Sequence, residues 1–89
     1  MTIVNKYGLH ARPAMQFVEL ANKYGSQIQV SNGTLRVDAK SIMSVMRLAA
    51  TKGTELTILA DGSDSAEAIE ALIALVADGF GEMEGDESG

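Results

Sequence analysis

The sequence predicts an α+β fold in which helices cover one face of a small, mostly antiparallel sheet. Apolar residues repeat with helical spacing in some segments and at every second position in others. Helices with one apolar stripe and strands with one apolar face pack as two layers. The 89 residues, 46% of them hydrophobic and 21% charged, suit one folded domain. We expect this domain to span residues 1–81, followed by an acidic, flexible tail over residues 82–89.

A short strand and a helix are expected first. The strand is formed by Ile3 and Val4. The chain begins only nine residues before His10, so either this strand is short or the start of the chain is incomplete. The helix begins at Ala11, and Gly25 stops it. Its apolar face is predicted from four residues at helical spacing, Ala14, Phe17, Val18 and Ala21.

A β-hairpin follows, with strands over "QIQV" and "LRV". The dipeptide Asn32-Gly33 between them suits a tight type I′ turn. The alternation places four apolar residues on one face of the hairpin, Ile28, Val30, Leu35 and Val37.

A short helix, a strand and a longer helix complete the expected order β-α-β-β-α-β-α. The short helix opens at Ser41, a good N-cap residue, and the strand is "ELTILA". Asp64 and Glu67 occupy the cap and third positions of the last helix and predict a variant capping box, and Gly79 ends that helix. Its apolar face is predicted from Ile69, Leu72, Ile73 and Val76.

The composition excludes several function classes. The chain has no cysteine and one histidine, which rules out disulfides, thiolate chemistry and metal sites built from cysteines or histidine clusters. We therefore expect no metal and no cofactor. No segment resembles a signal peptide or approaches about 20 consecutive apolar residues, so we expect a cytoplasmic protein without membrane insertion.

The charge is unevenly distributed along the chain. Residues 1–54 carry a formal charge of +5 and residues 55–89 carry −10. An acidic total disfavours nucleic-acid binding, and the aromatic residues Tyr7, Phe17, Tyr24 and Phe80 lie outside the predicted strands. The basic half either meets an acidic partner or is ordinary solvated surface.

The stretch "GLHARPAM" holds the only histidine and the only proline of the chain. With a helix starting at Ala11, His10 is its N-cap and Pro13 lies in the first turn, where a missing N–H costs no hydrogen bond. Free backbone N–H groups, the helix dipole and Arg12 suit a phosphoryl group. A neutral imidazole, with an ordinary pKa of about 6.5, is a nucleophile near neutral pH.

No carboxylate precedes Glu19, so the stretch offers no local base to activate water. A stand-alone enzyme is therefore not expected. The arrangement suits a residue that holds a phosphoryl group and releases it to another protein. The alternative is that His10 is a plain capping or surface residue and Pro13 a plain helix-start residue.

Two stretches together resemble one known family. "NKYGLHARPA" is similar to the active-site signature of the histidine-containing phosphocarrier HPr family of the phosphoenolpyruvate-dependent phosphotransferase system. "KSIMSVMRLAATKG" resembles its second signature, around a regulatory serine. The two occur in the family's order, and the resemblance covers nearly the whole chain.

The resemblance implies a function and a topology. His10 would accept a phosphoryl group on Nδ1 from enzyme I and pass it to a type IIA protein or domain. Arg12 would stabilise that group together with the backbone N–H groups of Ala11 and Arg12. Ser41 would be phosphorylated by an HPr serine kinase in members that have one; otherwise it is only a helix cap. The implied fold is a four-stranded open-faced sandwich of strand order 1-4-2-3, with three helices on one face.

The resemblance also implies where partners dock. The short middle helix has too many apolar residues to bury them all, although core packing is the simpler explanation for most. We assign four residues to the docking face of a monomeric protein: Met15, Ile42, Met43 and Arg47. A rim of Arg12, Lys40 and Arg47 would suit acidic partners. A regulatory relative in a nitrogen-related branch of the same system is the alternative to a sugar-transport phosphocarrier.

Overall fold

The computed structural model describes residues 1–4, 11–48 and 53–81. In these residues the elements follow the expected helix and strand order, except that the first strand is not formed. They are α1 (Ala11–Ala21), β1 (Gln27–Ser31), β2 (Arg36–Asp38), α2 (Ile42–Met46), β3 (Thr57–Asp61), α3 (Ser65–Ala77) and a short 3₁₀ turn, η1 (Gly79–Gly81). The predicted α+β class is confirmed.

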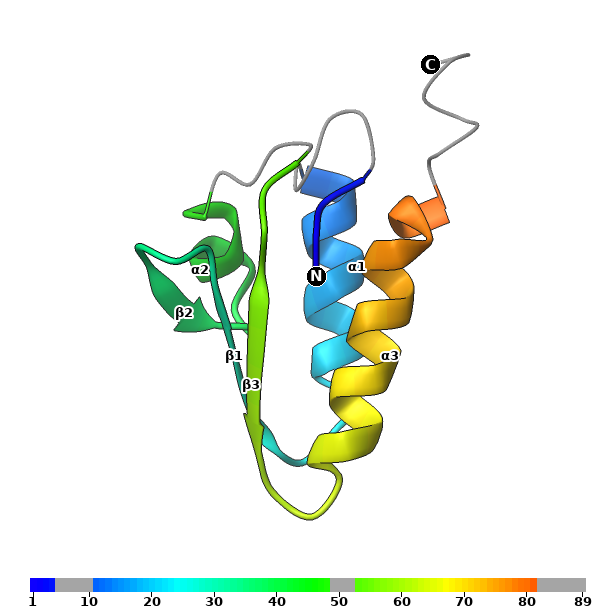
Figure 1. Cartoon of the computed structure of the whole chain (residues 1–89). Coiled ribbons are helices and arrows are strands. Elements are labelled where there is room, and N and C mark those ends of the chain that lie inside the picture. The colour runs from blue at the N-terminus through cyan, green and yellow to red at the C-terminus, as the bar shows by residue number, and fades with distance from the viewer. Residues whose placement is uncertain (5–10, 49–52, 82–89) are drawn as a thin grey trace.

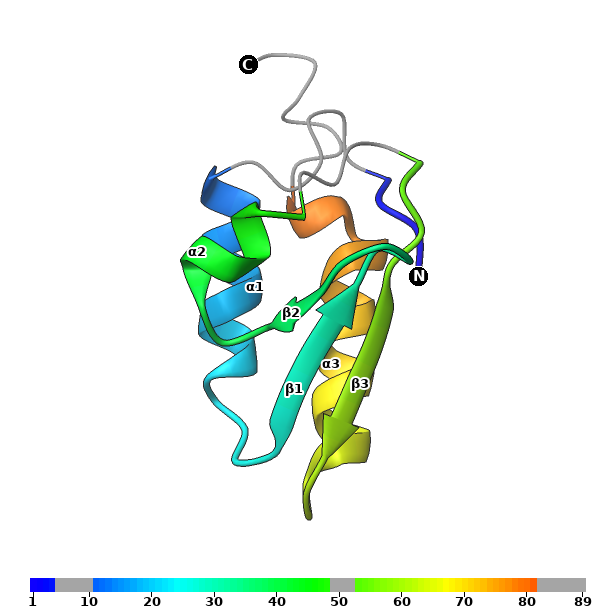
Figure 2. The same cartoon turned by 90° about the vertical axis from the view of Figure 1, so that its left-hand side faces the viewer.

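The sheet has β1 in its centre, with β2 and β3 antiparallel to it on either side. Val30 of β1 lies opposite Val37 of β2 and Ile58 of β3, so apolar side chains line up across the three strands. The long helices α1 and α3 cover one face of the sheet, and α2 lies against α1 near β2 (Figures 1 and 2). This arrangement is an open-faced α+β sandwich.

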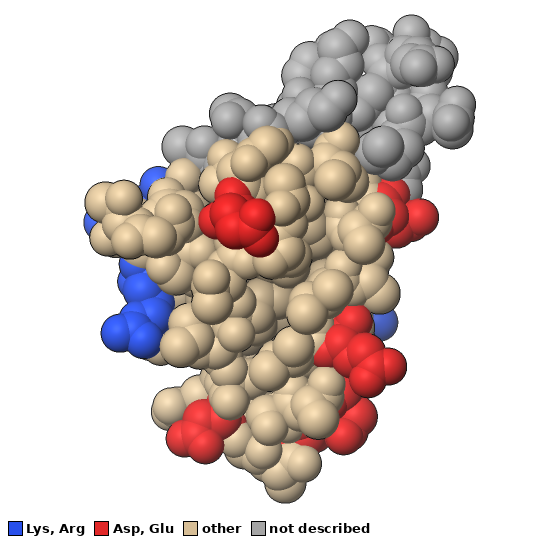
Figure 3. Space-filling model, viewed as in Figure 1, with Lys and Arg blue, Asp and Glu red and all other residues tan. Residues whose placement is uncertain are grey.

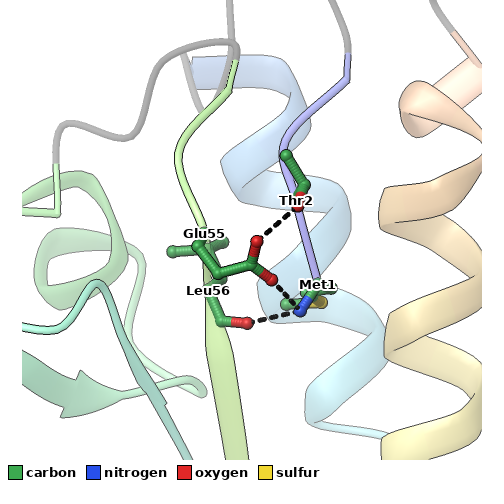
Figure 4. Close-up of polar contacts among 4 residues, drawn as sticks. All are labelled: Met1, Thr2, Glu55 and Leu56. Carbon is green, nitrogen blue, oxygen red and sulfur yellow. Dashed lines mark hydrogen bonds and ion pairs between the residues drawn. The ribbon is translucent and has the colours of Figure 1, made fainter.

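The predicted first strand is present only as an isolated bridge, between Thr2 and Glu55. The N–H of Ile3 donates to the carbonyl of Thr54 at 2.8 Å, and the Met1 amine donates to the carbonyl of Leu56 at 2.7 Å. Figure 4 shows the Glu55 carboxylate between the Thr2 hydroxyl and the Met1 amine. These two donors, Thr2 first, hold the pKa of Glu55 below its usual value. The described sheet is thus three-stranded, and the four-stranded order 1-4-2-3 stays a prediction.

The turn between β1 and β2 differs from the predicted two-residue type I′ turn. Ser31 pairs with Arg36, so four residues connect the strands, and only Gly33 has a positive φ, +96°. The side-chain carbonyl of Asn32 accepts the N–H groups of Thr34 and Leu35 at 3.0 and 2.8 Å. Asn32 therefore organises a wider loop through its side chain, as an Asx turn does.

The start of α3 also differs from the predicted capping box. Asp64 is the N-cap residue, but its carboxylate makes no hydrogen bond to its own helix. It accepts instead from the N–H of Gly25 at 2.9 Å, the N–H of Ser26 at 3.0 Å and the Ser26 hydroxyl. The carboxylate thus joins the loop after α1 to the start of α3.

The helix α1 ends earlier than predicted. Its last residue is Ala21, and two tighter turns follow, in which Lys23 and Tyr24 donate to Leu20 and Ala21. Gly25 comes after these turns and does not stop the helix. The predicted apolar face is confirmed, because Ala14, Phe17 and Ala21 are fully buried and Val18 packs partly against the core.

The face that α3 buries is slightly rotated from the predicted one. Leu72 and Val76 are buried as expected, but Ile73 is 43% exposed and Ala68 is buried instead. Gly79, with φ +65°, follows the helix end as predicted. No helix in the described ranges is long and apolar enough to cross a membrane. The largest fully buried side chains are Ile3, Pro13, Phe17, Ile28, Val30, Val45, Leu56, Leu72 and Val76.

Candidate functional site

The candidate site begins at the N-terminus of α1. The helix starts at Ala11, as predicted, and its first turn carries no acidic residue. Pro13, its third residue, is buried against the core and thereby fixes the helix start. His10 lies outside the described residues. The N–H groups of Ala11 and Arg12 have no acceptor within the helix, so this end of α1 favours an anion.

Arg12 is the second residue of α1 and is exposed. Its guanidinium makes no ion pair within residues 1–4, 11–48 and 53–81, where the one ion pair joins Met1 and Glu55. Arg12 is therefore a permanent positive charge within one helical turn of the start of α1, available to an anionic group.

Ser41 is the N-cap of α2, as predicted. Its backbone is extended, with φ −113° and ψ 118°, and its hydroxyl accepts the N–H of Ser44 at 3.4 Å. The distance is long for a hydrogen bond, so the cap is a weak one. The hydroxyl group is half-exposed at the positive end of the α2 backbone.

The apolar residues of α2 point in two directions. Val45 and, just after the helix, Leu48 are buried, whereas Met43 is 75% and Met46 44% exposed. On the neighbouring helix α1, Met15 is 52% exposed. We call these three side chains the methionine patch: Met15, Met43 and Met46.

Three of the four docking residues assigned from the sequence are therefore exposed. Met15, Met43 and Arg47 are exposed, whereas Ile42 is half-buried and packs against the core. Met46 was not assigned to this face. Its position three residues after Met43 on a helix was the signal available in the sequence.

Lys40 and Arg12 lie near opposite ends of α1. The Lys40 ammonium group donates to the carbonyl of Tyr24 at 2.7 Å, just beyond the C-terminus of α1. Arg12 is at the other end of this helix, which is about 16 Å long at 1.5 Å per residue. A cation satisfies carbonyl groups left unpaired after a helix, and Lys40 does so here from 16 residues further along the chain.

Further hydrogen bonds hold the backbone next to Ser41. The N–H of Lys40 donates to the Asp38 carboxylate at 2.9 Å, and its carbonyl accepts from the Asn22 amide at 3.1 Å. Lys40 therefore connects the start of α2 to the end of α1 through both its side chain and its backbone.

Figure 3 shows how charges are distributed on one face of the molecule. Basic side chains gather at the left edge, where α2 and β2 lie in Figure 1, and acidic side chains are more common on the side of α3. The helix α3 contains Glu67 and Glu70 and no basic residue. The uneven charge along the chain therefore becomes an uneven charge across the fold.

Comparisons with known proteins agree on one family. The family model described as "PTS HPr component phosphorylation site" matches residues 1–78. The chain is 51% identical over 83 residues to the phosphocarrier protein HPr of Cupriavidus necator, covering 93% of each chain. It is 48% identical to the crystal structure of HPr-C-His from Thermoanaerobacter tengcongensis, with a TM-score of 0.88 and 92% of each chain covered.

A third relative is a solved structure of a dimer. The crystal structure of Crh, the catabolite repression protein of Bacillus subtilis, is 46% identical, with a TM-score of 0.75 and 83% of this chain and 85% of that chain covered. That structure is described as a dimer with a swapped domain. The family match, the identity to curated relatives and the shared fold all cover most of the sequence. The chain belongs to the HPr family of phosphocarriers of the phosphoenolpyruvate-dependent phosphotransferase system.

Proposed function

We propose that this phosphocarrier accepts a phosphoryl group on Nδ1 of His10 from enzyme I and passes it to a type IIA protein or domain. The observation that carries the proposal is that α1 begins at Ala11, the residue directly after His10. A phosphoryl group on that imidazole would lie near the helix N-terminus, where the dipole and the free N–H groups stabilise negative charge.

The transfer is a displacement at phosphorus. The bond between phosphorus and its donor atom on enzyme I breaks as the bond to His10 Nδ1 forms, and the reverse exchange delivers the group to the acceptor. Arg12 stabilises the charge on the transferred oxygens, and it is exposed and free of ion pairs in the described residues. The protein catalyses no small-molecule reaction by itself.

Ser41 is proposed as a regulatory phosphorylation site for an HPr serine kinase. A phosphate group there would lie at the start of α2, next to Met43, which is 75% exposed. The added charge would stand in the face that meets acidic partners and would repel them. The docking face of this proposal consists of Met15, Ile42, Met43 and Arg47.

The remaining features of the proposal concern the protein as a whole. We place it in the cytoplasm as a monomer, with residues 1–81 as the folded domain and residues 82–89 as a tail. Light scattering of the purified protein gives its mass in solution, and a dimer mass would contradict the monomer.

The central experiment is a phosphorylation assay. The protein is incubated with phosphoenolpyruvate and enzyme I, and its intact mass is measured. We expect one added phosphoryl group that is lost in acid and kept in base, as for a phosphoramidate. His10→Ala should not be labelled, and undiminished labelling of this variant would contradict the proposal. As a folding control, the circular dichroism spectrum of His10→Ala should match that of wild type.

A second assay identifies the acceptor. The labelled protein is offered either a type IIA protein of a sugar permease or one of the nitrogen-related branch. Faster transfer to the sugar permease component supports a sugar-transport phosphocarrier, whereas faster transfer to the other component supports a regulatory role.

A further inference from the structure

We propose that the methionine patch is an oxidation site through which peroxide controls docking. In this proposal hydrogen peroxide converts the thioethers of Met43, Met15 and Met46 to sulfoxides, and docking of enzyme I weakens. The effect on docking rests on the proposed function, whereas the oxidation itself depends only on the exposure of the side chains.

Most of the described sulfur atoms lie at the surface. The chain has no cysteine, so its sulfur oxidation chemistry belongs to its five methionines. Met43, Met15 and Met46 are 75%, 52% and 44% exposed. Met1, in contrast, packs partly buried against the core. Peroxide therefore reaches the patch more readily than it reaches Met1.

The exposed apolar residues are unevenly distributed over the described part of the fold. In the described residues five large apolar side chains are exposed, and the three methionines among them are on the adjacent helices α1 and α2. Met43 and Met46 are one helical turn apart on α2. Oxidation would therefore change exposed side chains of two helices that pack against each other.

The chemistry is a two-electron oxidation of sulfur. A lone pair of the thioether takes one oxygen atom from hydrogen peroxide, the O–O bond breaks, and the rest of the peroxide leaves as water. The sulfoxide is polar and accepts hydrogen bonds, and methionine sulfoxide reductases return it to the thioether with electrons from thiols. The step is therefore reversible.

Oxidation of the methionine patch should affect docking and not the hydrophobic core. The buried residues of the same helices are others, including Phe17, Ala14 and Val45, so oxidation of the patch leaves the core unchanged. A partner that docks there must remove water from three polar sulfoxides in place of three thioethers, which costs binding free energy. Docking should weaken while the fold stays intact.

The experiment starts with a peroxide titration of the purified full chain. Peptide mass spectrometry gives the rate of sulfoxide formation at each methionine. Among the described methionines, we expect Met43 to react first and Met1 last. The melting temperature should stay within about 2 °C, because no core side chain changes. In the phosphorylation assay the apparent KM for enzyme I should rise about fivefold or more with a smaller change in kcat. Treatment with both sulfoxide reductases and a thiol should restore the starting KM.

The control is a triple variant, Met15→Leu, Met43→Leu and Met46→Leu, which keeps Met1 and Met83. Each protein is compared with its own untreated sample, so a change in the starting KM does not affect the result. The variant should keep its own KM after peroxide. An equal loss in variant and wild type would overturn the proposal, as would an unchanged KM in wild type with all three sulfoxides formed.

The same data separate this proposal from the proposed function. If untreated wild type is not labelled by enzyme I, the proposed function fails, and the peptide rates alone decide whether the patch is an oxidation site. Equal oxidation rates at Met43 and Met1 would then reject it.

Discussion

The two ends of α1 differ in what surrounds them. Beyond its C-terminus, Asp64 and Lys40 make hydrogen bonds to the backbone of residues 24–26, so that α1, α2 and α3 are joined there. At its N-terminus, Arg12 is exposed and Met15 lies one turn further along the helix, also exposed. Figure 1 shows these ends at opposite sides of the molecule.

The difference indicates that one end of α1 serves stability and the other end serves contact with partners. Hydrogen bonds near the C-terminal end connect segments that are distant in sequence and should contribute mainly to stability. Exposed charge and apolar surface near the N-terminal end contribute little to stability and are available to partners. Substitutions at the first end should therefore change the melting temperature, and substitutions at the second end should change phosphoryl transfer.

The largest effect is expected for Gly62→Ala. Gly62 has φ +153°, and an added Cβ would lie 2.7 Å from the Ser26 Cα, a backbone atom that cannot move aside easily. We expect a loss of about 2–3 kcal/mol in the free energy of unfolding. Thermal unfolding followed by circular dichroism measures it, and the melting temperature should fall by roughly 10 °C or more.

Gly25→Ala is the matched control for Gly62→Ala. An added Cβ there would meet only the Asp64 carboxylate, at 4.0 Å, and Gly25 has no positive φ. Its melting temperature should stay near that of wild type. Equal losses in the two variants would show that the close approach at Gly62 does not limit stability.

Arg12→Ala should change transfer and not stability. The side chain buries no core volume, so the free energy of unfolding should stay within about 0.5 kcal/mol. Loss of its charge should slow transfer from enzyme I roughly 10- to 100-fold. The rate is measured by quenching transfer reactions at successive times. Arg36→Ala is the control, because it removes the same charge from β2. Equal rates for the two variants would mean that Arg12 is an ordinary surface charge.

Asp64 should make stability depend on pH. The Ser26 hydroxyl, followed by the N–H of Gly25, lowers the pKa of Asp64 in the folded protein. Its contribution to stability is therefore complete above the ordinary carboxylate pKa of about 3.9 and is lost as the pH falls through the lower folded value. Melting curves of wild type and Asp64→Ala should differ at pH 7 and converge at acidic pH.

Ser26→Ala completes that test. It removes one donor to the same carboxylate, so its effect and that of Asp64→Ala should not add in the double variant. Additive losses would show that the two side chains stabilise the fold independently. Neither variant should change transfer at neutral pH, provided that the protein is folded at the assay temperature.

Ser41→Asp should have a smaller effect, on docking alone. Asp is a good N-cap, so the stability should be close to that of wild type, whereas Ser41→Ala should lose about 0.5 kcal/mol because the observed cap bond is long. The apparent KM for enzyme I should rise for Ser41→Asp and recover as salt screens the repulsion. Equal transfer by the two variants at low salt would leave Ser41 as a helix cap only.

Removal of residues 82–89 should have the smallest effect. This stretch is polar and acidic, with little apolar surface to bury. Both the melting temperature and the transfer rate should hardly change. A fall of more than about 5 °C, roughly 1 kcal/mol for a domain of this size, would show that the tail packs on the domain.

Features that depend on neighbouring residues could be predicted from the sequence. The helix start at Ala11 and the cap at Ser41 depend on neighbouring residues, and both predictions are confirmed. Apolar periodicity likewise predicted the helices and most of their buried faces. These features are local, so the sequence contains their cause directly.

The wrong predictions share a different origin. Asp64 has a better set of donors at residues 25–26 than in its own helix. Ile73 is exposed because packing of α3 on α1 and β3 selects Ala68 instead. Each of these depends on contacts between residues distant in sequence, which are set only when the fold is formed.

The short edge strand β2 has a consequence for a protein that must diffuse between partners. An unpaired strand edge attracts the edges of other chains and promotes sheet extension into aggregates. Here that edge is three residues long, and its exposed side chains are Arg36 and Asp38, on either side of the buried Val37. Such a brief, charged edge gives a second molecule few hydrogen bonds and requires it to face two charges. This edge of the sheet therefore disfavours pairing with a second molecule.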